Sequence, residues 1–178
     1  HMALLVQDSP FDMNATRSKL FSSMVMNEIP KHTIWTWGLG VVGQLGHGDM
    51  DNKLLPQPVE ALAQKSIRQI SCGATHTVAI VNVESHNLSQ VSRGRVAFWG
   101  ANFPHKESSK SVPASKLLPE YLNFTKSNKK SNVAEQVACG DHFTAILDED
   151  GKITVIGLSP TTNKPVVVSS GNLLQFIF

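Results

Sequence analysis

A glycine pattern in the first third of the chain matches a signature of dinucleotide binding. The segment GLGVVG at residues 38–43 fits G-x-G-x-x-G and follows a run that favours a strand. A dinucleotide site needs a helix to begin here, so that its N-terminus faces the pyrophosphate. Gly46, Gly48 and Pro56 follow closely and oppose such a helix. We therefore expect these glycines to serve turns, and we expect no cofactor.

Cysteine and histidine are the side chains that could bind a metal or attack a substrate. The chain has two cysteines, Cys72 and Cys139, and seven histidines, but no CxxC, HxxxH or comparable ligand pair. Both cysteines occupy the same place in a repeat, which favours a structural role as small buried residues. His76 lacks an obvious nucleophile, since the serines lie mostly in loops. We expect neither a metal site nor a catalytic residue.

The sequence lacks the other motifs that a protein kinase requires. The run Val78–Ile80 is followed by Val81 where a kinase requires lysine, and the chain has no HRD or DFG sequence. Together with the missing cofactor, metal and nucleophile signals, this pattern predicts that the protein is not an enzyme.

The most polar stretch of the chain, residues 105–132, holds six lysines and two glutamates. One interpretation is a solvated insertion. The other is a basic loop that contacts an acidic partner, phosphate backbone included. On the second interpretation the candidate partner-binding residues are Lys126, Lys129, Lys130, Arg93 and Arg95.

The composition is that of a globular protein of one domain. The 178 residues are 41% hydrophobic and 17% charged, with a net charge of +2 that does not by itself predict nucleic-acid binding. No stretch approaches the roughly 20 consecutive apolar residues of a membrane helix, so we expect no membrane association. Only two cysteines, without disulfide-like spacing, favour an intracellular protein of the cytoplasm or nucleus.

Two separate motifs recur in the same order along the chain. The segments IWTWG, VAFWG and ITVIG, at residues 34–38, 96–100 and 153–157, are apolar runs that end in glycine. Between them, QISCGATHTVA at 69–79 returns as QVACGDHFTAI at 136–146. In each copy a short apolar run leads into Cys-Gly, a turn follows, and another apolar run begins. This pattern predicts paired antiparallel strands.

These repeats resemble those of the regulator of chromosome condensation family. The first repeat, with IWTWGLGVVGQLGHGD at residues 34–49, is the most complete match. The second is degenerate, and the third is partial. The repeat residues that carry the resemblance are Trp37, Gly38, Gly43, Gly46, Cys72, Gly73, Trp99, Gly100, Cys139 and Gly140.

The resemblance implies an all-β fold, a partial β-propeller of about two to three antiparallel blades over residues 31–178. We expect Trp37 and Trp99 to pack between neighbouring blades. Propellers close with about four to eight blades, so we expect further repeats or another chain to complete this one. The hydrophobic end of the chain, residues 173–178, would otherwise leave a strand edge that invites pairing.

The N-terminal segment, residues 3–30, has a different pattern. Leu20, Phe21, Met24 and Val25 are spaced for one side of a helix within residues 9–27. A short packing helix and a partner-docking helix are both open interpretations. We treat His1 and Met2 as a remnant of expression that lies outside the fold.

Three functions are consistent with the sequence. The first is a scaffold for protein interaction, because repeated residues build the blades while variable ones gather in loops. The second comes from the resemblance, which implies guanine nucleotide exchange on a small GTPase, with the long loop at residues 81–93 as a wedge. The third is binding of chromatin or nucleic acid through the basic loop.

Overall fold

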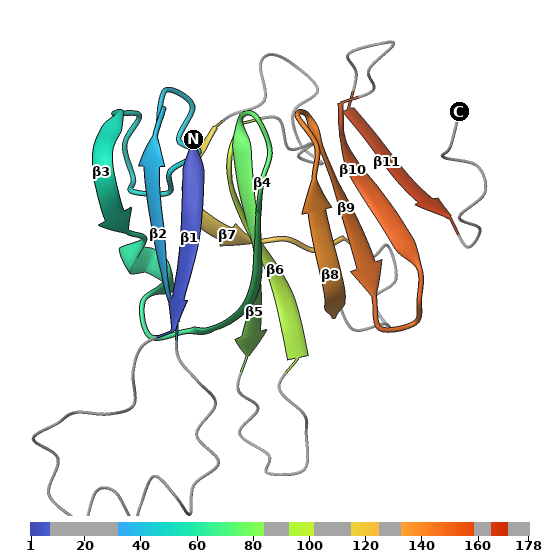
Figure 1. Cartoon of the computed structure of the whole chain (residues 1–178). Coiled ribbons are helices and arrows are strands. Elements are labelled where there is room, and N and C mark those ends of the chain that lie inside the picture. Colours follow the sequence, from blue (N-terminus) through green and yellow to red (C-terminus); the bar gives the residue numbers. More distant parts are fainter. Residues whose placement is uncertain (8–31, 84–92, 102–114, 125–132, 159–164, 171–178) are drawn as a thin grey trace, which may run out of the picture.

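The computed structural model describes residues 1–7, 32–83, 93–101, 115–124, 133–158 and 165–170. They form three antiparallel sheets (Figure 1). Sheet 1 contains β1 (Met2–Gln7), β2 (His32–Gly38) and β3 (Lys53–Pro58), in that spatial order. Sheet 2 contains β4 (Ser66–Cys72), β5 (His76–Val83), β6 (Arg93–Gly100) and β7 (Lys116–Tyr121). Sheet 3 contains β8 (Ala134–Cys139), β9 (Phe143–Asp148), β10 (Ile153–Leu158) and β11 (Pro165–Ser170).

The sheets stack face to face, and the core lies in the two junctions between them. A short 3-10 helix, η1 (Glu60–Leu62), closes sheet 1 against sheet 2 and buries Leu62. The junction of sheets 1 and 2 holds Ile34, Val59, Leu62, Ile67, Ala79, Val81, Ala97 and Trp99. The junction of sheets 2 and 3 holds Val78, Ile80, Val96, Phe98, Phe124, Ala134, Val137, Ile146 and Ile156. The alternation of apolar residues to both faces of β5 and β6 builds both cores.

The predicted repeat equivalence is confirmed by strand register. The two tryptophan-glycine pairs end β2 and β6, where Gly38 and Gly100 adopt φ angles of +98° and +100°. Cys72 and Cys139 are each the last residue of the first strand in sheets 2 and 3. Successive sheets therefore repeat one supersecondary unit, as the predicted partial propeller requires.

A further repeat, which the sequence analysis did not use, lies in the outermost strands. β3 begins KLLP and β7 begins KLLP, and each pairs with the strand that ends in tryptophan and glycine. The two prolines are tolerated because β3 and β7 are edge strands.

The N-terminal expectations need correction. Residues 3–7, part of the segment expected to be helical, belong to strand β1, and the helix expected over residues 9–27 lies outside the described residues. His1 and Met2 are also part of the fold. Met2 pairs with Trp37, and His1 Nε2 lies 2.9 Å from Thr77 Oγ1 in sheet 2. All residues of β1 except Gln7 are apolar, so apolar side chains lie on both faces of this strand.

The two tryptophans differ in surroundings. Trp99 is 0% exposed in the junction of sheets 1 and 2, as predicted. Trp37 is half-buried and shares with its partner Met2 the face of sheet 1 that is turned away from sheet 2. The prediction of packing between blades is thus confirmed for Trp99, whereas no described sheet covers Trp37.

Among the described residues, no helix has the length and hydrophobicity needed to cross a membrane.

Candidate interaction surface

A glycine-rich turn, residues 39–52, connects β2 to β3 and is folded tightly on itself. Gly43 N–H donates to the Gly40 carbonyl at 2.8 Å, and Gly46 N–H donates to the Gly43 carbonyl at 3.1 Å. Gly43 and Gly46 adopt φ angles of +77° and +79°, which L side chains rarely adopt. The described residues after Gly43 form turns and bends rather than a helix, so the GLGVVG segment shapes this connection.

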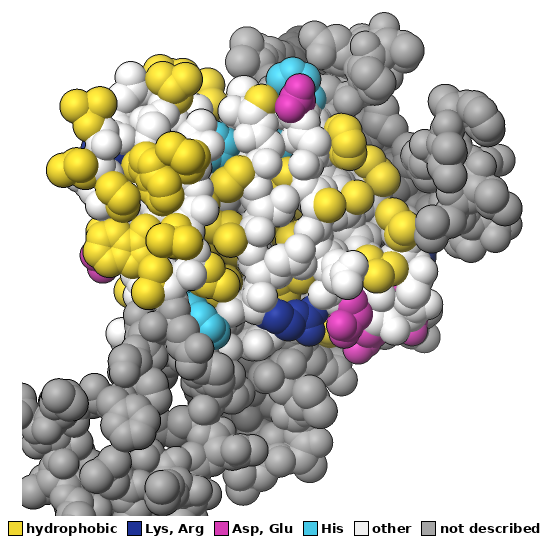
Figure 2. Space-filling model, viewed as in Figure 1, with side chains coloured by type: hydrophobic (Ala, Val, Ile, Leu, Met, Phe, Trp, Pro, Cys, Tyr) yellow, Lys and Arg dark blue, Asp and Glu magenta, His cyan; other side chains and the backbone are white. Residues whose placement is uncertain are grey.

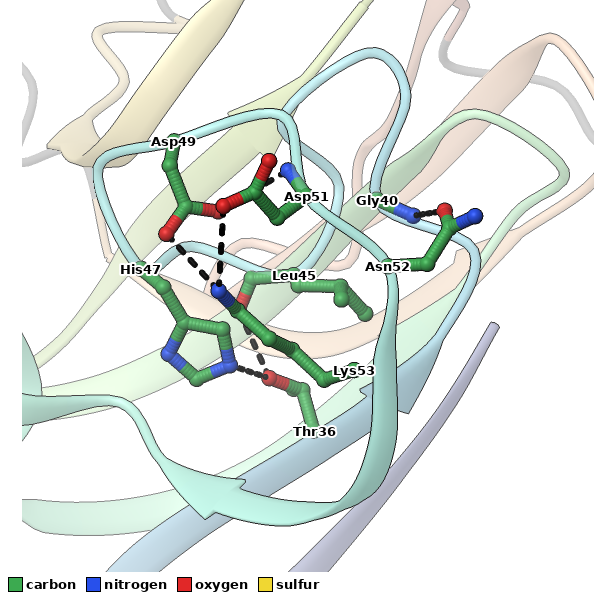
Figure 3. A network of polar contacts seen from close by, with 8 residues as sticks. All are labelled: Thr36, Gly40, Leu45, His47, Asp49, Asp51, Asn52 and Lys53. Atoms are coloured by element: carbon green, nitrogen blue, oxygen red, sulfur yellow. Dashed lines mark hydrogen bonds and ion pairs between the residues drawn. The ribbon is translucent and has the colours of Figure 1, made fainter.

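A polar network holds the base of the turn (Figure 3). Thr36 Oγ1 donates to the Leu45 carbonyl at 2.7 Å and lies 3.0 Å from His47 Nε2. Lys53 Nζ contacts Asp49 Oδ2 at 2.9 Å and Asp51 Oδ2 at 3.8 Å. Burial and the positive charge of Lys53 lower the pKa of His47 below its ordinary value. Because Thr36 donates its one hydroxyl hydrogen to Leu45, His47 Nε2 carries the ring hydrogen and donates to Thr36 Oγ1.

The inner side of the turn docks on sheet 2. A Cβ at Gly46 would lie 2.8 Å from the Trp99 indole nitrogen, so only glycine allows this approach. Gly48 N–H donates to the Leu117 carbonyl at 3.0 Å, and Thr77 Oγ1 donates to the Gln44 carbonyl at 2.9 Å. The turn is thus fixed from two sides and locks sheet 1 to sheet 2.

The outer side of the same turn is apolar and exposed. Leu39 and Val41 are each 57% exposed, and Met50 is 49% exposed. Leu54 and Leu55 of β3 are 94% and 74% exposed, and as consecutive strand residues they point to opposite faces of the strand. We call Leu39, Val41 and Met50 the turn surface. Exposed apolar side chains on a rigid support are the usual composition of a protein contact site. Apolar residues at positions 39, 41 and 42, between the glycines of a turn, are the sequence signal that could have indicated this surface.

The basic residues predicted to bind a partner are not gathered by the described structure. Lys126, Lys129 and Lys130 lie outside the described residues. Arg93 begins β6, and its side chain is not among those described. Arg95, further along β6, stacks over the Tyr121 ring at 4.3 Å from its centroid. Binding through these five residues stays a prediction.

The two cysteines and His76 occupy structural positions. Burial raises the pKa of both Cys72 and Cys139, so these thiols are poor nucleophiles. His76 Nε2 lies 2.8 Å from Thr144 Oγ1 of sheet 3, and burial lowers the pKa of His76 to about 4. Within the described part of the chain, no three His, Cys, Asp or Glu side chains are grouped as metal ligands.

The stacked antiparallel sheets, each repeating the same strand unit, define a partial β-propeller with its repeats in successive blades. Residues 31–80 match the sequence model of the regulator of chromosome condensation (RCC1) repeat. The chain carries repeats of the RCC1 family.

Known proteins with similar sequence or structure agree with this assignment. The chain is 40% identical to mouse Protein RCC2 over 124 residues, which covers 70% of the chain and 21% of that protein. It is 31% identical to mouse serine/threonine-protein kinase Nek9 over 126 residues, 67% of the chain and 11% of that protein. The structure of Prp20p from Saccharomyces cerevisiae matches with a TM-score of 0.57 at 19% identity, over 82% of the chain and 35% of Prp20p. The chain thus spans about a tenth to a fifth of these two relatives.

Proposed function

We propose that the chain is a protein-interaction module, without covalent catalysis of its own, that presents the turn surface to a protein partner inside the cell. The proposal rests on one observation. Leu39 and Val41 are both 57% exposed on a turn whose opposite side is hydrogen-bonded to sheet 2. Ordering these side chains on binding costs little entropy because the backbone beneath them is already fixed.

The polar network supports the same proposal. Lys53 is held by Asp49 and Asp51, so its charge is matched within the turn. The hydrogen bond from Gly40 N–H to Asn52 Oδ1, at 2.9 Å, joins the two ends of the turn. Shape and apolar contact, more than net charge, then govern which partner fits.

A small GTPase is the first partner class to test. Prp20p is a structural neighbour whose binding properties to Gsp1p and histones have been studied. By analogy, the module would bind a small GTPase and regulate nucleotide exchange, or would bind histones. The likeness to Prp20p establishes the fold only, so both partner classes are part of this proposal.

The experiment measures binding of the chain to small GTPases, free of nucleotide and loaded with GDP, and to core histones, by biolayer interferometry. The double variant Leu39→Asp with Val41→Asp should weaken binding at least about tenfold, because it places carboxylates in an apolar contact. Phe143→Asp, at a phenylalanine of sheet 3 that is 46% exposed, is the control. Unchanged binding by the double variant contradicts a role for the turn surface.

Nucleotide release from the same GTPases separates exchange from simple binding. Acceleration by the wild-type chain supports the exchange hypothesis. Binding without acceleration supports a scaffold.

A further inference from the structure

Side chains accept two amide hydrogens in the part of the turn that carries exposed apolar residues. Gly40 N–H donates to Asn52 Oδ1 at 2.9 Å, and Val42 N–H donates to Gln44 Oε1, also at 2.9 Å. These two amides lie on either side of the apolar residue between them. The backbone conformation of residues 39–42 therefore depends on two side chains that lie outside this segment.

Asn52 reaches Gly40 from the far end of the turn, directly before β3 (Figure 3). The two ends lie close together, since a Cβ at Gly40 would clash with the Asp51 carbonyl oxygen. Asn52 is exposed, so water can replace it as the partner of Gly40 N–H when the side chain is removed. Its removal should therefore loosen residues 39–42 and leave the sheets intact.

Gln44 ties the same segment to sheet 2. Its side chain accepts from Val42 N–H, and its backbone carbonyl accepts from Thr77 Oγ1 of β5 at 2.9 Å. Gln44 is only 3% exposed, so a partner on the surface of the molecule does not reach it. An effect of Gln44 on binding has to act through the residues that it holds.

The apolar side chains that the turn presents are few. Leu39 and Val41 are each 57% exposed, and Met50 completes the turn surface. Figure 2 shows hydrophobic side chains gathered over β1–β3, the sheet that contains the two strands joined by the turn. A small apolar contact binds well only when its side chains are already arranged as the partner requires, because ordering them on binding costs free energy. The backbone conformation of residues 39–42 thus controls binding at this surface.

We propose that Asn52 and Gln44 are positioning residues of the turn surface. They hold residues 39–42 in the conformation that a protein partner binds, and they act through Leu39 and Val41 rather than by contact with the partner. This inference rests on the proposed function and adds the residues that set the affinity of the surface. A partner binds only the fraction of molecules in the competent conformation. Loss of either bond therefore lowers the association rate constant and leaves the dissociation rate constant unchanged.

Amide hydrogen exchange followed by NMR tests the positioning itself. Asn52→Leu removes the acceptor at similar size, whereas Asn52→Asp keeps a carboxylate oxygen in its place. The Gly40 amide should exchange at least about fivefold faster in Asn52→Leu, because its hydrogen bond is lost. In Asn52→Asp the same amide should exchange as in the wild-type chain.

Biolayer interferometry with core histones and nucleotide-free small GTPases tests the effect on binding. Asn52→Leu and Gln44→Met should each lower the association rate constant at least about threefold. Asn52→Asp should restore it when measured at high salt, which screens the added charge. Gln57→Leu, at an exposed glutamine of β3, is the matched control and should bind as the wild-type chain does. Circular dichroism shows that each variant is folded.

The double variant Leu39→Asp with Val41→Asp separates failure of this inference from failure of the proposed function. If the double variant binds more weakly but Asn52→Leu and Gln44→Met associate as the wild-type chain does, the positioning role is overturned and the turn surface remains the contact. Unchanged exchange of the Gly40 amide in Asn52→Leu, or a change confined to the dissociation rate constants, also overturns it. A double variant that binds as tightly as the wild-type chain, or a wild-type chain that binds none of these probes, overturns the proposed function and the positioning role with it.

Discussion

Sheets 1 and 2 place the same tryptophan-glycine pair at the end of equivalent strands, but only one of the two tryptophans is buried. Trp99 lies under the turn of sheet 1 and is 0% exposed. Trp37 has the same place in its strand and is half-buried, since no described sheet covers it. The comparison teaches that burial in this fold comes from the neighbouring sheet, and that a repeat residue contributes to stability only when that neighbour is present.

The largest expected contrast is between alanine substitutions of these two tryptophans. Trp99→Ala should lower the free energy of unfolding by about 3–5 kcal/mol, because it leaves a large cavity in a closed junction. Trp37→Ala should cost at most about 1–2 kcal/mol, because its ring is only partly buried and no described sheet packs against it. Urea unfolding at low protein concentration measures the loss of stability in each variant. Equal losses would contradict the difference in burial between the two tryptophans.

Two glycines of the turn separate steric contact from backbone strain. Gly46→Ala should cost about 2–4 kcal/mol, because it combines a φ of +79° with a Cβ 2.8 Å from the Trp99 ring. Gly48 has a φ of +88° but only ordinary contact with Leu118, so Gly48→Ala should cost about 1–2 kcal/mol. Urea unfolding measures the free energy of unfolding of both variants, and the difference between the two losses reports the close packing of Gly46 against Trp99. Equal losses would contradict that close packing.

The junction of sheets 2 and 3 should be sensitive to acid. The folded-state pKa of His76 is lowered to about 4 from 6.5, so below pH 6.5 the unfolded chain binds the proton more readily. Stability is fully present above pH 6.5 and is lost as the pH falls towards 4, by about 2 kcal/mol between pH 7 and pH 5. His76→Gln should flatten this part of the stability curve. A curve of the same slope in the variant would assign the acid sensitivity to other groups.

The smallest expected effect concerns the contact between Arg95 and Tyr121 on sheet 2. Arg95→Gln removes the stacking on Tyr121 and should lower stability by about 0.5–1 kcal/mol. Thermal unfolding at two salt concentrations measures it. A loss as large as that of Trp99→Ala would show that Arg95 does more than cover a ring.

The sequence alone predicted much of this fold because its repeats are regular. Trp99-Gly100 and Cys139-Gly140 mark strand ends, and the antiparallel pairing of the sheets followed from them. The strand at residues 2–7 was missed because its apolar run is short and does not alternate with polar residues, and because His1 and Met2 were set aside. The helical spacing of apolar residues further along the N-terminal segment then led to the prediction of a helix there.

The candidate site could be predicted only in part. The glycines of residues 38–48 indicated a turn, but which side of that turn is buried depends on the approach of Trp99 and Leu117 from another sheet. Contacts between residues so far apart in the chain leave no local pattern. The exposure of Leu39 and Val41, on which the proposed function rests, is therefore a structural result.

Hydroxyl-radical footprinting read by mass spectrometry tests the central claim most directly, because it reports the solvent exposure of each side chain. Met2 and Trp37 should be oxidised more readily than Trp99, which the turn and sheet 1 protect. Trp99 and Trp37 reacting at the same rate would contradict an account in which equivalent repeat positions differ only by the sheet that covers them.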